Sequence, residues 1–123
     1  MEIEEYKKQK FDELKRRFAN EEQALQEKGY HLNLDVFSEP YFDEKEREVG
    51  INVFLEITIT PSFSAKLTYY HILCENFGQD NEELCEIEEF ISQLQFDIQK
   101  IIKGGAKAFK NIYYQKYSPF RLA

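Results

Sequence analysis

The chain has 123 residues, of which 42% are hydrophobic and 15% aromatic, and its formal net charge is −7. A chain of this length buries roughly two-thirds of its unfolded surface on folding, which is enough for one hydrophobic core. We therefore expect a single domain over residues 1–123, and the composition excludes an intrinsically disordered protein.

The N-terminus and the cysteines bear on where the protein resides. The first residues lack the apolar run of a signal peptide, and no stretch has the length and hydropathy of a membrane span. We expect a cytoplasmic protein with no membrane partner. Cys74 and Cys85 do not have Cys-x-x-Cys spacing, so reduced thiols are expected rather than a zinc site or a disulfide.

The charge is unevenly distributed along the chain. Residues 100–123 contain six basic and no acidic side chains, whereas residues 1–99 contain ten basic and 23 acidic side chains, a net charge of −13. This asymmetry predicts either a basic tail that docks on its own acidic body or a partner that is attracted electrostatically.

Residues 3–28 have the periodicity of an amphipathic helix, because apolar residues recur mostly at spacings of three, four and seven. Gly29 is expected to end this helix. The apolar positions are Ile3, Tyr6, Phe11, Leu14, Phe18 and Leu25.

The next three segments have the period of two that is typical of strands. Over residues 30–37 apolar side chains occupy every second position, and the segment Ser38-Glu39-Pro40 is expected to end this strand. Residues 43–48 are expected to form an exposed connection or a long hairpin. Residues 49–60 show the clearest alternation, and a third strand over 66–74 completes a meander. Which face of this third strand is buried stays open between two sets: Leu67, Tyr69 and Leu73, or Tyr70, Ile72 and Cys74.

A second helix is predicted to begin at Asp80, because Asp80 and Glu83 have the spacing of a capping box. Its apolar stripe continues to Ile101, and the two glycines at 104 and 105 are expected to stop it. The basic, aromatic C-terminal segment, residues 104–123, leaves open a short third helix over 106–117 that docks on the body.

Together these elements predict an α+β fold. We expect a three-stranded antiparallel β-meander with an N-terminal and a C-terminal helix packed on one face, in the order α-β-β-β-α, with a short third helix left open. The opposite face of the sheet is then partly exposed. Phe37, Phe54 and Tyr70 predict an aromatic patch there, of the kind found at interfaces.

The titratable residues do not form a recognisable catalytic or metal-binding motif. His31 and His71 fall in strands, without a serine or cysteine in a nucleophile motif. The acidic run from Asp80 to Glu89 lacks the alternate spacing and the glycine of a calcium loop. We therefore predict that the protein is not an enzyme and needs no metal or cofactor.

One pair of carboxylates requires a separate comparison. Asp35 and Glu56 lie on neighbouring strands, as the metal ligands of restriction-type nucleases do. The lysine that those enzymes place two residues after the glutamate is Thr58 here. Without that lysine to position the attacking water, the sequence disfavours a nuclease.

We expect the chain to be an acidic protein-binding module. A strongly negative body steers towards positive partners, in the manner of inhibitors and immunity proteins that block a basic active site or a nucleic-acid channel. The predicted partner is a protein with a basic surface, and a homodimer stays open. The partner-binding residues are expected in two acidic runs: Asp43, Glu44, Glu46, Glu82, Glu83 and Glu86.

Two alternatives stay open. The first is nucleic-acid binding by the C-terminal segment, which interleaves lysines with tyrosines as suits phosphate contacts and base stacking. Its residues are Lys103, Lys107, Lys110, Lys116, Tyr113 and Tyr114. The second is a small-ligand pocket among Tyr69, Tyr70 and His71.

Overall fold

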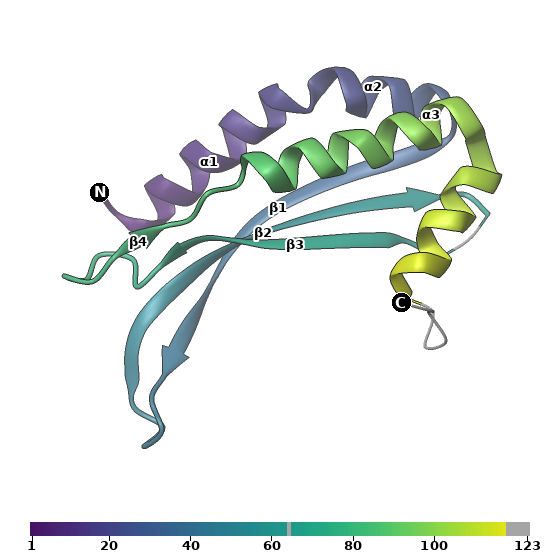
Figure 1. The fold of residues 1–123 in the computed structure, drawn as a ribbon. Coiled ribbons are helices and arrows are strands. Elements are labelled where there is room, and N and C mark those ends of the chain that lie inside the picture. The colour runs from purple at the N-terminus through teal and green to yellow at the C-terminus, as the bar shows by residue number, and fades with distance from the viewer. Residues whose placement is uncertain (64, 118–123) are drawn as a thin grey trace.

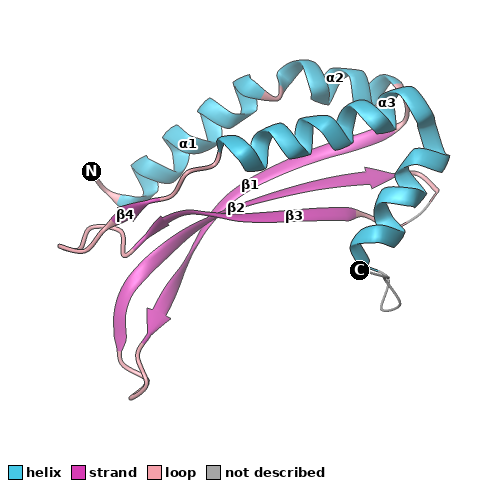
Figure 2. Cartoon of the chain, viewed as in Figure 1, coloured by secondary structure: helices cyan, strands magenta, loops and turns pink. Residues whose placement is uncertain are grey.

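Helices cover one face of an antiparallel sheet in the computed structural model, which describes residues 1–63 and 65–117 (Figures 1 and 2). The elements are α1 (Ile3–Arg17), α2 (Ala19–Glu27), β1 (Tyr30–Phe42), β2 (Glu48–Pro61), β3 (Leu67–Glu75), β4 (Glu83–Leu84) and α3 (Glu88–Tyr117). The strand order is β1-β2-β3-β4, and each strand is antiparallel to its neighbour. The predicted α+β fold is confirmed, and β4 is a short addition to the expected meander.

The core lies between the sheet and the helices. The alternating side chains of β2 that face the helices are completely buried, as are those of the apolar stripe of α3. These core residues are Val53, Leu55, Ile57, Ile59, Ile91, Leu94, Ile98 and Ile101. Burial of such side chains contributes about 1.5–3 kcal/mol each, so this packing fixes which side of each strand faces the helices.

The N-terminal helix is divided at Phe18, where the backbone leaves the helical region (φ −100°, ψ 9°). The Phe18 N–H still donates to the Leu14 carbonyl at 3.0 Å, and its own carbonyl accepts from the Glu22 N–H at 2.8 Å. Because the bonding is nearly continuous, α1 and α2 run end to end along the sheet (Figure 1). Leu14, Phe18 and Leu25 all remain buried.

The β1–β2 hairpin is longer than the sequence pattern indicated. Pro40 does not end β1, which pairs with β2 from Tyr30 opposite Pro61 to Phe42 opposite Glu48. Proline is tolerated because β1 is an edge strand, which pairs with another strand on one side only. The N–H that proline lacks is therefore not needed on the side that faces solvent. The far end of this hairpin projects beyond the helices (Figure 1).

A bulge in the β2–β3 pairing determines which residues of β3 are buried. Leu67 and Tyr69 face the helices, and the register shifts between Val53 and Phe54. Because a bulge breaks the alternation, Leu73 and Cys74 are both buried although they are consecutive. The first of the two open sets, Leu67, Tyr69 and Leu73, is therefore the buried one, and of the second set only Cys74 joins it.

The predicted helix start at Asp80 is wrong. The Glu82 carboxylate accepts the N–H of Gly78 at 2.6 Å in a turn, and Glu83 pairs with Glu75 as part of β4. Pairing with the end of β3 satisfies the backbone of this segment, so the helix starts at Glu88 instead.

Helical geometry is interrupted at Gly105, where the sequence predicted a stop, and the residues that follow form the short helix that the sequence left open. Gly105 has φ 64° and ψ −146° inside α3, which therefore has two arms on either side of a kink. The second arm, residues 106–117, runs past the end of the sheet (Figure 1). Phe109 is completely buried, with its ring centroid 5.6 Å from that of Tyr30. Residues 118–123, the end of the basic, aromatic C-terminal segment, lie outside the described residues.

We predict that Gly105→Ala destabilises the fold by about 1–3 kcal/mol, because only glycine readily adopts this backbone conformation. The free energy of unfolding in urea measures the effect. Lys103→Ala, an exposed helical position before the kink, is the control and should change stability by less than about 0.5 kcal/mol. Equal effects of the two substitutions would refute the strained kink.

Candidate functional site

The face of the sheet opposite the helices carries no helix in Figure 2, and we call it the open face. Side chains alternate along a strand, so the buried positions of β1 and β2 place the residues between them on the open face. The central residues of this face are Asp35, Phe37, Glu39, Phe54, Glu56, Tyr70 and Ile72. These central residues include three carboxylates, and the strand residues of the open face include neither lysine nor arginine.

An aromatic row crosses the open face. Phe37 is the register partner of Phe54, and their rings stack with centroids 5.5 Å apart and planes 23° apart. Tyr70 on β3 adds a ring whose residue is 61% exposed. A hollow of about 240 Å³ lies among Phe37, Glu39, Phe54 and Tyr70, and we call it the aromatic hollow. The aromatic patch expected from the sequence is therefore present.

Carboxylates lie on both sides of this row. Asp35 and Glu56 are register partners on β1 and β2, and Glu56 is also the register partner of Tyr70. Like charges directly opposite each other destabilise a sheet. In residues 1–63 and 65–117, none of Asp35, Glu39 and Glu56 forms an ion pair. The open face therefore carries negative charge that the described residues do not neutralise.

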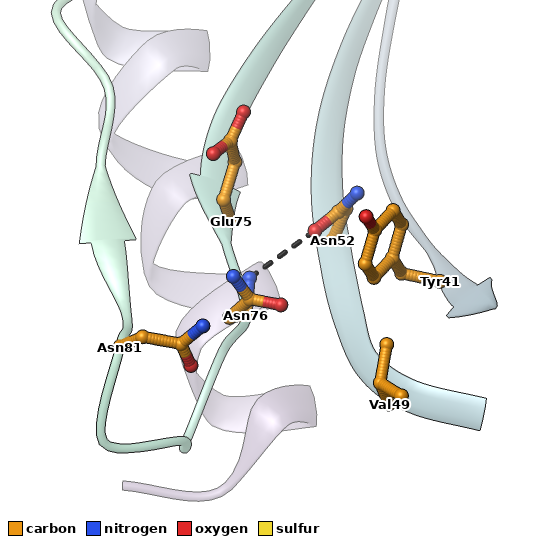
Figure 3. A pocket seen from close by; sticks show the side chains of 6 residues that line it. All are labelled: Tyr41, Val49, Asn52, Glu75, Asn76 and Asn81. Atoms are coloured by element: carbon orange, nitrogen blue, oxygen red, sulfur yellow. Dashed lines mark hydrogen bonds between the residues drawn. The ribbon is translucent and has the colours of Figure 1, made fainter. Parts of the chain in front are cut away.

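A second hollow of about 290 Å³ lies towards the turn end of the β1–β2 hairpin (Figure 3). Its side chains come from both hairpin strands, the end of β3 and the loop before β4. They are Tyr41, Val49, Asn52, Glu75, Asn76 and Asn81. The Asn76 N–H donates to Asn52 Oδ1 at 3.1 Å, which ties the loop to β2. Tyr41 follows Glu39 at the next position on the same side of β1, so this groove extends the open face towards the hairpin.

The acidic residues predicted to bind a partner lie in two separate places. Asp43, Glu44 and Glu46 are at the tip of the hairpin, whereas the other three flank or form β4 (Figure 1). The Asp43 carboxylate accepts the backbone N–H groups of Arg47 and Lys45 and pairs with the Arg47 side chain. These hydrogen bonds, led by that from the Arg47 N–H, lower the pKa of Asp43.

Two acids near β4 also form hydrogen bonds within their own segments. Glu82 holds the turn at Gly78, and the Glu86 carboxylate accepts the Glu88 N–H at the start of α3. Glu44, Glu46 and Glu83 are exposed. A partner contact by the six predicted residues stays a prediction. Three acids of the open face, Asp35, Glu39 and Glu56, were not among the predicted partner-binding residues, although strand alternation alone places them on one side with Phe37 and Phe54.

The basic C-terminal arm packs on the body of the protein. The Tyr117 hydroxyl accepts the Thr68 N–H at 2.8 Å and donates to the Thr68 carbonyl at 3.2 Å. Lys116 Nζ lies 4.5 Å from the ring centroid of Tyr69, and Lys110 Nζ lies 5.8 Å from that of Phe63. Cation–π contacts thus involve two of the four lysines of the nucleic-acid alternative.

The other residues of that alternative differ in exposure. Lys103, Lys107 and Tyr114 are exposed, whereas Tyr113 is half-buried with its ring centroid 4.8 Å from that of Tyr117. Two hollows of about 440 and 480 Å³ lie beside the kink of α3 and share Lys100, Ile112 and Gln115. Nucleic-acid binding by this arm stays a prediction.

Two of the three residues of the predicted small-ligand pocket, Tyr69 and Tyr70, line the hollow of about 440 Å³, whereas His71 is not among its lining residues, and a ligand there stays a prediction. Tyr69 and His71 face α3, where the Tyr69 hydroxyl donates to Asp97 Oδ2 at 3.0 Å and the His71 ring lies 4.9 Å from Phe90. Tyr70 lies on the opposite side of β3. Burial, together with the Asp97 charge, raises the pKa of Tyr69. This tyrosine is therefore a neutral hydrogen-bond donor near physiological pH.

The cysteines offer no activated nucleophile. Burial raises the pKa of the Cys74 thiol to about 11, and burial also raises the pKa of Cys85. Both thiols are free in the described residues and are protonated near neutral pH. Within the same residues, no group of three or more His, Cys, Asp or Glu side chains could hold a metal ion.

Comparison with known proteins finds no family model, curated protein or solved structure that matches this chain. Over the residues that the structure describes, no helix is both long and apolar enough to cross a membrane.

We predict that Glu56→Gln stabilises the fold by about 0.5–1 kcal/mol at low salt, because it removes the like-charge repulsion with Asp35. Urea unfolding at low and high salt measures the gain, which should shrink as salt screens the remaining charges. Glu44→Gln at the hairpin tip is the control, since Lys45 and Arg47 adjoin it. The Thr58 hydroxyl donates to Glu56 Oε1 at 3.4 Å, so a loss of stability in Glu56→Gln would show that this contact outweighs the repulsion.

Proposed function

We propose that the chain is a protein-binding module that docks on a basic partner protein through its open face. The observation that carries this proposal is the aromatic row set between carboxylates on a face whose strand residues include neither lysine nor arginine. An exposed cluster of aromatic side chains is typical of the centre of a protein interface. Carboxylates that lack a cation in the free protein are suited to receive cations from a partner.

The two components of the open face contribute differently to binding. Tyr70 and the Phe37–Phe54 pair supply apolar area at the centre, where most of the binding energy of an interface is concentrated. Asp35, Glu39 and the body charge of −13 attract a positive surface over a longer range and accelerate association. We therefore expect the association rate to fall with added salt more strongly than the dissociation rate changes.

The activity that best fits this surface is inhibition. An acidic face placed over a basic active site or nucleic-acid channel occupies the positions where the anionic substrate would bind. Glu44 and Glu46 at the projecting hairpin tip extend the negative surface beyond the sheet. In this proposal the module is an inhibitor or immunity-type protein, and it acts by covering the site without chemistry of its own.

The central prediction is that neutralising the acids of the open face abolishes capture of the partner. The variant carries Asp35→Asn, Glu39→Gln and Glu56→Gln. The control carries Glu5→Gln, Asp12→Asn and Glu27→Gln, which change the charge equally on exposed positions of α1 and α2.

The captured protein is identified by mass spectrometry after isolation from native lysate at low salt, and it is then titrated in pure form. We expect its association rate to fall at least about tenfold with the open-face variant and much less with the control. Equal losses in the open-face variant and the control would show that net charge, and not the position of the acids, determines the association rate.

The nucleic-acid alternative is tested in the same experiment with a third variant. Lys103→Gln, Lys107→Gln and Lys110→Gln remove exposed charges on both sides of the kink of α3 while leaving Phe109 in the core. We expect this variant to capture the same basic protein as the unmodified chain. Capture of RNA or DNA that disappears with this variant would contradict the proposal.

A further inference from the structure

The aromatic hollow has acids at its edges as well as rings in its walls. Glu39 contributes directly to the lining, together with Phe37, Phe54 and Tyr70. Glu56 is the cross-strand neighbour of Tyr70, at the distance where opposite side chains of a sheet interact. A group that enters this hollow therefore meets an aromatic surface and carboxylate oxygens at once.

We propose that the aromatic hollow receives an arginine side chain of the basic partner, an inference that rests on the proposed docking through the open face. A guanidinium is flat, so one of its faces can stack on a ring while its edge donates paired hydrogen bonds to a carboxylate. Tyr70, with its exposed ring, supplies the stacking surface, and Glu39 or Glu56 supplies the acceptor.

The geometry favours arginine over other cations. The Phe37 and Phe54 rings are 5.5 Å apart, which is less than the roughly 7 Å needed to hold a flat group between two rings at ordinary contact distances. The hollow is therefore not an aromatic cage for a quaternary ammonium group. It is a one-sided surface, which suits a planar cation better than the compact, strongly hydrated ammonium of lysine.

A second copy of this chain is a poor source of that arginine. Among the described arginines, Arg47 pairs with Asp43 and Arg17 pairs with Glu88, so Arg16 on α1 is the one that a second copy could offer without breaking either ion pair. Two open faces brought together would also place their carboxylates against each other. A basic partner of different sequence avoids both costs.

The test titrates the protein with N-acetyl-arginine amide, N-acetyl-lysine amide and choline, and follows the aromatic resonances by NMR. We expect saturable shifts at Tyr70, Phe37 and Phe54 with the arginine amide, and binding at least about fivefold weaker for the other two probes. Tyr70→Ala should weaken the binding of the arginine amide by about fivefold. The matched control is Tyr114→Ala, since Tyr114 is 64% exposed and Tyr70 is 61% exposed.

Three results would overturn the inference. They are equal affinity for arginine and lysine amides, tighter binding of choline, and unchanged arginine affinity in Tyr70→Ala. Self-association in sedimentation that Tyr70→Ala abolishes would also overturn it, because the occupant would then be a second copy.

The two proposals fail separately. If the arginine amide does not bind but capture still depends on the acids of the open face, only the arginine inference fails. If the amide binds as expected but no basic protein depends on those acids, the docking function fails and the hollow remains an arginine site.

Discussion

Burial of one face of β2 against the helices is the constraint on which the rest of the structure depends. Val53, Leu55, Ile57 and Ile59 are completely inaccessible to solvent, and no shift of register by one residue could keep them so. Once these positions are buried, every residue between them must lie on the open face. The negative aromatic surface is thus a direct consequence of how β2 packs.

The path of α3 keeps the two charged parts of the molecule in different places. The kink at Gly105 turns the second arm past the end of the sheet, where Phe109 enters the core and Tyr117 bonds to the backbone of Thr68. The lysines of this arm are therefore held beside the sheet by the burial of its aromatic residues. Asp35 and Glu56 at the centre of the open face keep their charge without a basic neighbour on that face.

Local sequence patterns predicted the strands and helices in which buried residues recur at a regular spacing. The alternation over 49–60 and the apolar stripe ending at Ile101 were sufficient, because one buried face dictates the residue types. The same alternation placed Phe37 and Phe54 on the exposed face. Features set by pairing between distant segments were not predictable. Pro40 is tolerated only because β1 is an edge strand, and Asp80 lies in a turn because the following residues pair with β3.

For the candidate site too, features set by a local pattern were predictable and features set by distant pairing were not. The exposed aromatic residues followed from the strand pattern, but the opposition of Asp35 and Glu56 depends on the register of a hairpin whose turn lies several residues away. The densest acidic runs of the sequence contain both occupied carboxylates and exposed ones, the latter being Glu44, Glu46 and Glu83. In such runs Asp43 and Glu82 already accept backbone N–H groups of their own turns, since short acidic side chains and turns occur together.

The most direct measurement is a titration of the unmodified protein with a short arginine-rich peptide, followed through the backbone amide resonances. Docking through the open face predicts that the largest shifts occur at Asp35, Phe37, Phe54 and Tyr70, and that they weaken with salt. Shifts confined to the hairpin tip at residues 43–47 or to β4 would contradict it, because the acids of the open face would then not be the ones that receive a basic partner.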